Sequence, residues 1–254
     1  MPRRVFSGLR DTVRVSLTVL AAMVGCTATA GADTWNPGDL ITHGPSNWGG
    51  DPMVDAGAAL VNGKYFTVYK SGFLITGGHF TSSFDNPKSV ISYLPAVGAP
   101  ASLTGSSLDA TSTASGAFGG DVLALQLNVD FSDAGLLTGS SGLRFGDLVL
   151  ANFSTLPNLN GLTVRQFLAD VNVALGDEPS IYLISDLDPI TGELNGSFGD
   201  GGVSPFAQDH LLAPAAVETA TAPLPGGVAP FLVLLCIAWA LNRRGKRRAD
   251  PRTE

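Results

Sequence analysis

The sequence predicts an α+β fold: a single globular ectodomain that contains helices and a small β element, flanked by a signal peptide and a C-terminal transmembrane helix. Three observations carry this prediction. Apolar residues recur at helical spacing between Thr163 and Gly176. β-branched and aromatic residues lie on both sides of Gly77-Gly78, a pattern typical of a hairpin. Both ends of the chain carry a short apolar run next to arginines, as export signals and membrane anchors do.

Residues 1–32 predict a signal peptide that is recognised by the Sec export machinery. Four arginines precede an apolar run, and Ala30 and Ala32 occupy the small-residue positions of a cleavage site. Cleavage is therefore expected directly after Ala32. An alternative is lipidation at the lipobox-like stretch Met23-Val24-Gly25-Cys26.

The ectodomain is predicted over residues 33–206, and its first half is expected to consist of short elements. Composition favours a helix at 55–69, the hairpin at 73–84 and a connector rich in Ser, Thr, Ala and Gly at 98–116. Asn86-Pro87 predicts another helix start, because Asn caps a helix well and Pro fits its first turn. That helix is expected to end before Pro95.

The apolar run at 118–131 fits two periods. Leu123, Leu125 and Leu127 alternate with smaller or polar residues, as in a strand. Phe118, Val122, Leu125 and Val129 also fall at helical spacing. The run is long for a strand, which favours a buried helix.

Two more helices are expected towards the end of the ectodomain. Thr163 and Gly176 are a good cap and a good stop for a helix at 163–175. Residues 181–198 favour a second helix, interrupted by Pro189 and closed by the glycines of 199–202. An Ala/Pro-rich linker is then predicted at 207–222.

The tail reads PLPGGVAPFLVLLCIAWALNRRGKRR over residues 223–248. Its apolar part, 226–241, is about 24 Å long as a helix, which is short for a bilayer core of about 30 Å but can span it. Arg243 and Arg244 follow and favour the cytoplasmic side, so residues 249–254 form a cytoplasmic end. This topology places the ectodomain outside the inner membrane.

The order of these three parts resembles the PEP-CTERM sorting signal of Gram-negative bacteria. The resemblance rests on Pro223, Leu224, Pro225, Gly226 and Gly227, followed by the apolar span and the arginines. Leu224 stands where the commonest form of the signal has Glu. The resemblance implies that an exosortase, a membrane enzyme, processes the precursor. The protein would then pass from the inner membrane to the cell surface or the extracellular matrix. A plain single-span anchor is the alternative.

The middle of the chain carries a second resemblance. The stretches AGAALVNGKYFTVY, GDVLALQLNVDFSDAG and GLTVRQFLADVNVALG are similar to segments of a class of secreted or surface-anchored bacterial proteins. The similarity covers residues 35–211. It implies an exported, helix-containing module and brings no catalytic residues.

Charge and cysteine content exclude several classes of function for residues 33–222. Five Lys and Arg stand against nineteen Asp and Glu, a net charge of −14 that argues against nucleic acid as a partner. The two cysteines, Cys26 and Cys236, lie in the predicted signal peptide and tail. An ectodomain without cysteine has no disulfides, thiol catalysis or cysteine-based metal site.

Few residues point to chemistry. No histidine stands at zinc-ligand spacing, and no nucleophile motif occurs. Asp186, Asp188 and Glu193 are a candidate calcium cluster, since calcium prefers closely spaced carboxylates. Trp35 and Trp48 are expected to anchor their loop on the core, with sugar stacking as the alternative.

The leading hypothesis is a non-enzymatic exported surface or extracellular-matrix protein without a cofactor. A carbohydrate- or calcium-binding surface module is the second hypothesis, with extracellular polysaccharide as a further partner. A secreted hydrolase is the third.

Overall fold

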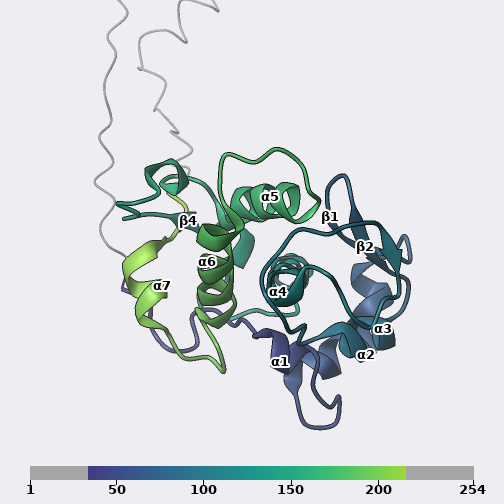
Figure 1. Cartoon of the computed structure of the whole chain (residues 1–254). Helices are drawn as coiled ribbons and strands as arrows, with labels where there is room; N and C mark the ends of the chain where they lie inside the picture. The colour runs from purple at the N-terminus through teal and green to yellow at the C-terminus, as the bar shows by residue number, and fades with distance from the viewer. Residues whose placement is uncertain (1–33, 216–254) are drawn as a thin grey trace, which may run out of the picture.

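The computed structural model describes residues 34–215 and shows an α+β fold built around one central helix. Helix α4 (Gly116–Asp133) runs through the middle of the molecule and is seen end-on in Figure 1. Phe118, Val122 and Val129 pack into one core cluster, and Leu127 and Phe131 into another on the opposite side. A helix that is buried all round is apolar all round. The two periods of this stretch therefore arise from a helix with two buried faces, which confirms the favoured helical interpretation.

The first core cluster is covered by the second half of the chain. Helices α5 (Val164–Leu175), α6 (Ile184–Gly196) and α7 (Pro205–His210) surround it. The 3₁₀ turns η1 (Phe145–Asp147) and η2 (Pro157–Leu159) and the short antiparallel pair β4 (Val149–Leu150) and β5 (Leu211–Leu212) complete this side.

The second core cluster is covered by the first half of the chain. Helices α1 (Pro45–Trp48), α2 (Ala56–Val68) and α3 (Pro87–Tyr93) pack beside a three-stranded sheet. Strands β1 (Leu74–Gly77) and β2 (Thr81–Phe84) form the predicted hairpin, and β3 (Ser107–Leu108) adds in parallel to β2.

Two predicted helix starts are confirmed at the level of the cap. The Asn86 side chain accepts a hydrogen bond from the backbone N–H of Ser89, at 3.0 Å. Thr163 and Gln166 form a reciprocal capping box at the start of α5. At the other end of α5, the Gly176 carbonyl accepts from the Phe80 N–H at 3.0 Å. A Cβ on Gly176 would overlap the Gly78 backbone, so glycine allows the hairpin turn to lie against the helix end.

Pro189 does not interrupt the helix at 181–198, contrary to the prediction. It lies inside α6, where it removes only the hydrogen bond to the Ser185 carbonyl. Leu187 and Leu194 are fully buried in the core, and this burial outweighs one lost hydrogen bond near the helix start.

The folded body extends further along the chain than the boundary predicted at 206/207. Ala207 and Leu211 are fully buried, and β5 pairs with β4. The Trp35 Nε1–H donates to the Leu211 carbonyl at 2.8 Å, and Trp35 also exchanges hydrogen bonds with Gln208. The first and last described segments therefore lie side by side (Figure 1). A linker beginning at 207 is wrong for residues 207–212.

No helix within residues 34–215 is both long and apolar enough to cross a membrane. The predicted signal peptide, the span at 226–241 and the sorting residues lie outside the described residues.

Candidate functional site

A pocket opens between the loop that follows β4, the start of α6 and the end of α7. Its volume is about 480 Å³. We call it the His210 pocket. Its lining combines hydroxyl, carboxylate, amide, imidazole and apolar side chains, from Asn152, Phe153, Ser154, Thr155, Leu156, Ser185, Asp186, Pro189, Ile190 and His210.

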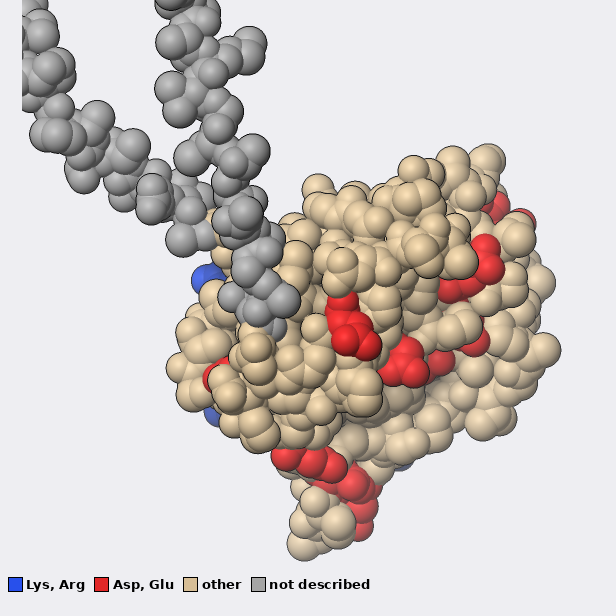
Figure 2. Space-filling view, turned by 90° about the vertical axis from the view of Figure 1, so that its left-hand side faces the viewer, with Lys and Arg blue, Asp and Glu red and all other residues tan. Residues whose placement is uncertain are grey.

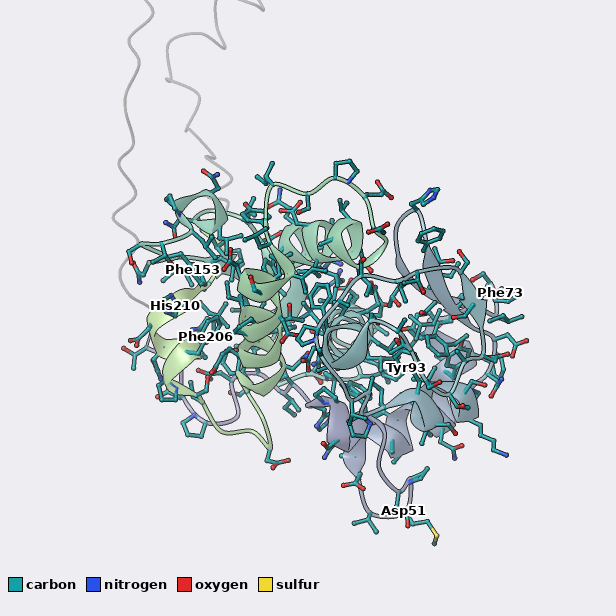
Figure 3. The ribbon with its side chains drawn as sticks, viewed as in Figure 1. Asp51, Phe73, Tyr93, Phe153, Phe206 and His210 are labelled. Atoms are coloured by element: carbon teal, nitrogen blue, oxygen red, sulfur yellow. The ribbon has the colours of Figure 1, made fainter. Side chains whose placement is uncertain are left out.

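Three aromatic side chains are grouped at this pocket. The His210 ring stacks on Phe153 with centroids 4.5 Å apart and an interplanar angle of 29°. Phe206 lies on the His210 ring as well, at 4.9 Å, and Figure 3 shows the three rings together. Stacking on Phe153 and a tilted contact with Phe206 hold the imidazole in place.

Hydrogen bonds tie the loop to α7 and orient the imidazole. His210 Nδ1 lies 2.9 Å from the Ala151 carbonyl, and the Ala151 N–H donates to the His210 carbonyl at 3.0 Å. A carbonyl only accepts, so Nδ1 carries the proton and Nε2 of the neutral ring is an acceptor. Asn152 has φ +63° and donates from Nδ2 to the Asp209 carbonyl at 2.6 Å. This left-handed turn, which Asn tolerates better than most residues, aims the following loop across the pocket.

The polar wall comes from the first turn of α6. Ser185 and Asp186 line the pocket, and Pro189 on the next turn has no N–H to satisfy the Ser185 carbonyl. The wall therefore offers a hydroxyl and a carboxylate. Such a site can accept hydrogen bonds from a polyhydroxylated or otherwise donor-rich ligand.

The three predicted calcium ligands do not converge. Two residues along a helix correspond to a turn of about 200°, so Asp186 and Asp188 project from different sides of α6. Glu193 shares the side of Asp186 but lies about 10 Å further along the axis. Within residues 34–215, no group of three or more His, Cys, Asp and Glu side chains is placed to hold a metal ion.

Asp188 instead faces another carboxylate across the α4–α6 interface. Burial, and then the negative charge of Asp188, raise the pKa of Asp121 to about 6. Burial also raises the pKa of Asp188, and its Oδ1 has no hydrogen-bond partner within the described residues. These two acids repel one another and weaken the interface when both are ionised.

Both ectodomain tryptophans are buried. Trp35 is 5 % exposed and Trp48 fully buried, each inside one of the two core clusters. Trp35 packs edge-on against Phe198, with centroids 5.4 Å apart. The anchoring interpretation is confirmed, and the alternative that these rings stack on sugars is wrong.

The sequence did not predict a site at His210, because residues from 207 onwards were assigned to a linker and His210 has no second histidine at zinc-ligand spacing. Phe206 was the last residue of the predicted ectodomain and had no assigned role. A local signal was present: the Ser204 hydroxyl accepts from the Ala207 N–H at 3.0 Å, and Pro205 occupies the first turn. Ser204-Pro205 is therefore a helix start that can be recognised in the sequence, and the helix that it begins, α7, ends at His210.

Comparison of the chain with protein-family models, with curated proteins and with solved structures found no match. The two resemblances noted in the sequence therefore stay predictions.

Proposed function

We propose that the protein is a non-enzymatic, exported surface or extracellular-matrix protein that an exosortase sorts through its C-terminal signal. One observation carries this proposal: Pro-Leu-Pro-Gly-Gly, a short apolar segment and a cluster of arginines follow each other in this order, in a chain that begins with an export-type signal. The precursor is held in the inner membrane and the folded body faces the periplasm.

The extent of the folded body supports this assignment. β5 ends at Leu212, Ala213 still packs against the first core cluster, and residues 214–222 separate it from Pro223. Nine residues reach at most about 32 Å when extended. A membrane enzyme can therefore reach the Pro-Leu-Pro stretch without unfolding any described element.

Replacing Pro223, Leu224 and Pro225 by alanine is expected to block processing. Proline favours an extended backbone, the conformation that active-site grooves bind, and alanine favours a helix instead. Immunoblots of membrane and extracellular fractions should show precursor accumulating in the membrane, with the exported form reduced at least tenfold. A matched alanine triplet at 217–219 should leave processing unchanged. Equal processing of both variants would contradict the proposal.

A second candidate function, carbohydrate binding by the exported body, is favoured by the His210 pocket. Sugar rings present both hydroxyl groups and apolar C–H faces, and this pocket offers carboxylate, hydroxyl and apolar aromatic groups together. Five basic against seventeen acidic residues in 34–215 disfavour a polyanionic ligand. Figure 2 shows acidic groups spread over one face and little basic surface. The ligand expected is therefore a neutral saccharide.

Asp186→Asn is expected to weaken binding of neutral oligosaccharides, released from the producing cells' own extracellular polysaccharide, by about tenfold. The expected loss is that of a charge-assisted hydrogen bond, about 1.5 kcal/mol. Glu193→Gln, on the same helix but outside the pocket, is the matched control and should bind normally. Titration calorimetry measures both. Equal affinities for the two variants would exclude this pocket as the sugar site.

A further inference from the structure

An apolar groove runs along one side of α2, at the edge of the second core cluster. Ala56, Ala59, Leu60, Gly63 and Lys64 line it, and their spacing places them on one face of the helix. Three of the five are small, so the groove stays open, with a volume of about 470 Å³. Along α2 the groove runs from Ala56 to Lys64, nine residues, a distance of about 12 Å.

The opposite wall is also apolar. It is built by Ile41 and His43 and by Leu136 and Leu137 after α4. The core side of α2 is formed by other residues, among them Val61 and Tyr65, so the helix is apolar on two sides. Within residues 34–215 this side of α2 stays open, and an exposed apolar helix face is a common binding surface.

Lys64 gives this groove its charge. None of the nine residues that line it is acidic, and Lys64 is the one Lys or Arg among them. Ion pairs in the part of the chain that the structure describes are found only at Arg165, so Lys64 has no carboxylate partner there. Residues 34–215 contain seventeen acidic and five basic residues, so most of the surface is negative. The groove differs from it, because its one charged side chain is positive.

His43 provides a second polar point on the wall. It is 6 % exposed, and its Nδ1 has no hydrogen-bond partner within residues 34–215. Burial lowers the pKa of His43, which favours the neutral ring. Lys64 is therefore the one charged side chain of the groove. The Nδ1 atom of His43 is a buried nitrogen without a hydrogen-bond partner within residues 34–215.

We propose that this groove binds a saturated fatty acid in its free, unesterified form, with the alkyl chain along α2 and the carboxylate beside the Lys64 ammonium. The apolar wall takes the chain, and charge complementarity selects the head group. An exposed ammonium–carboxylate pair provides selectivity of a few-fold, whereas the chain supplies most of the affinity, about fourfold for each buried CH₂.

The test compares three amphiphiles with the same twelve-carbon chain on the purified full-length protein, below the micellar concentrations of the two ionic amphiphiles and the solubility limit of dodecanol. Titration calorimetry should show laurate binding about threefold tighter than dodecanol and about tenfold tighter than dodecyltrimethylammonium. This order opposes the net negative charge of the protein, which by itself favours the cation. Lys64→Met, which keeps most of the apolar stem, should bring laurate and dodecanol to equal affinity.

Gly63→Leu tests the location of the site. A Cβ at Gly63 meets no atom within 4 Å, and leucine is a better helix former, so the variant should fold and fill the groove. It should lower laurate affinity at least tenfold, while Asn62→Leu, on the neighbouring exposed position, should not. The apolar tail is the same in every variant and cancels from the comparison.

Three results would overturn the proposal. Binding of dodecyltrimethylammonium as tight as laurate would show that no carboxylate is recognised. Unchanged laurate binding in Gly63→Leu would place the amphiphile elsewhere on the chain. No laurate binding, together with a concentration-dependent dimer that Gly63→Leu abolishes, would assign the groove to a second copy of the protein.

Discussion

Replacing Asn128 with alanine is expected to lower the free energy of unfolding by about 3 to 4 kcal/mol. Asn128 lies in α4, is fully buried and sits between the two core clusters. Its Oδ1 accepts from the His43 N–H and its Nδ2 donates to the His43 carbonyl, both at 2.8 Å. The same Nδ2 donates to Asn195 Oδ1 at 3.0 Å.

Alanine leaves three buried polar groups without partners and opens a cavity, and each effect costs about 1 kcal/mol or more. The loss also spreads, because Asn195 uses its own Nδ2 to hold the Asp121 carbonyl at 2.9 Å. This amide pair joins the segment before α1, the central helix and α6.

Urea unfolding followed by fluorescence of the buried tryptophans measures the effect. Asn62→Ala, an exposed position on α2, is the matched control, and its free energy of unfolding should change by less than about 0.5 kcal/mol. A loss below about 1 kcal/mol for Asn128→Ala would contradict the buried network.

Asp121→Asn is expected to stabilise the protein at pH 7.5 by about 1 to 2 kcal/mol. The pKa of Asp121 is about 6 in the folded state, because the carboxyl is buried and lies near Asp188, against about 3.8 in the unfolded chain. The folded state therefore binds the proton more tightly, and stability falls as the pH rises through about 6. Two pKa units correspond to about 3 kcal/mol, and partial solvation of the side chain reduces this.

The pH dependence gives the sharper measurement. From pH 5 to pH 7.5 the wild type should lose about 1 kcal/mol more stability than Asp121→Asn, judged from urea midpoints. Asp209→Asn, which removes one exposed carboxylate, controls for the change in net charge and should not stabilise the protein at pH 7.5 by more than about 0.5 kcal/mol. Parallel pH profiles of Asp121→Asn and the wild type would show that Asp121 is not the group that titrates.

Helix starts could be predicted where residues next to each other in the sequence form the cap. The side chains of Asn86 and Thr163 cap helices α3 and α5, and Gln166 completes the capping box of α5. Each cap involves only four consecutive residues, so it can be recognised in the sequence. Residues 118–131 fitted both a strand and a helix in the sequence because tertiary packing buries both faces of α4. Apolar residues therefore occur on both faces, and the alternation of apolar and polar faces that marks a surface helix is missing.

The candidate site was less accessible from sequence. The His210 pocket combines a loop, a helix start and a helix end that are separated by up to 58 positions, and no spacing rule links Asn152, Asp186 and His210. The calcium hypothesis treated Asp186 and Asp188 as neighbours, which holds in a loop. In α6 the helical turn separates them, and the burial of Leu187 between them fixes that separation.

The intact mass of the protein, purified from cells with and without their exosortase, tests the proposed sorting most directly. With the enzyme, the exported chain should lack the apolar segment 226–241, so its mass should correspond to a C-terminus close to the Pro-Leu-Pro-Gly-Gly stretch. Without the enzyme, the chain should remain in the membrane fraction and retain the apolar segment 226–241 and the arginines that follow it. The same C-terminus and the same location in both strains would contradict the proposal that this tail is an exosortase signal.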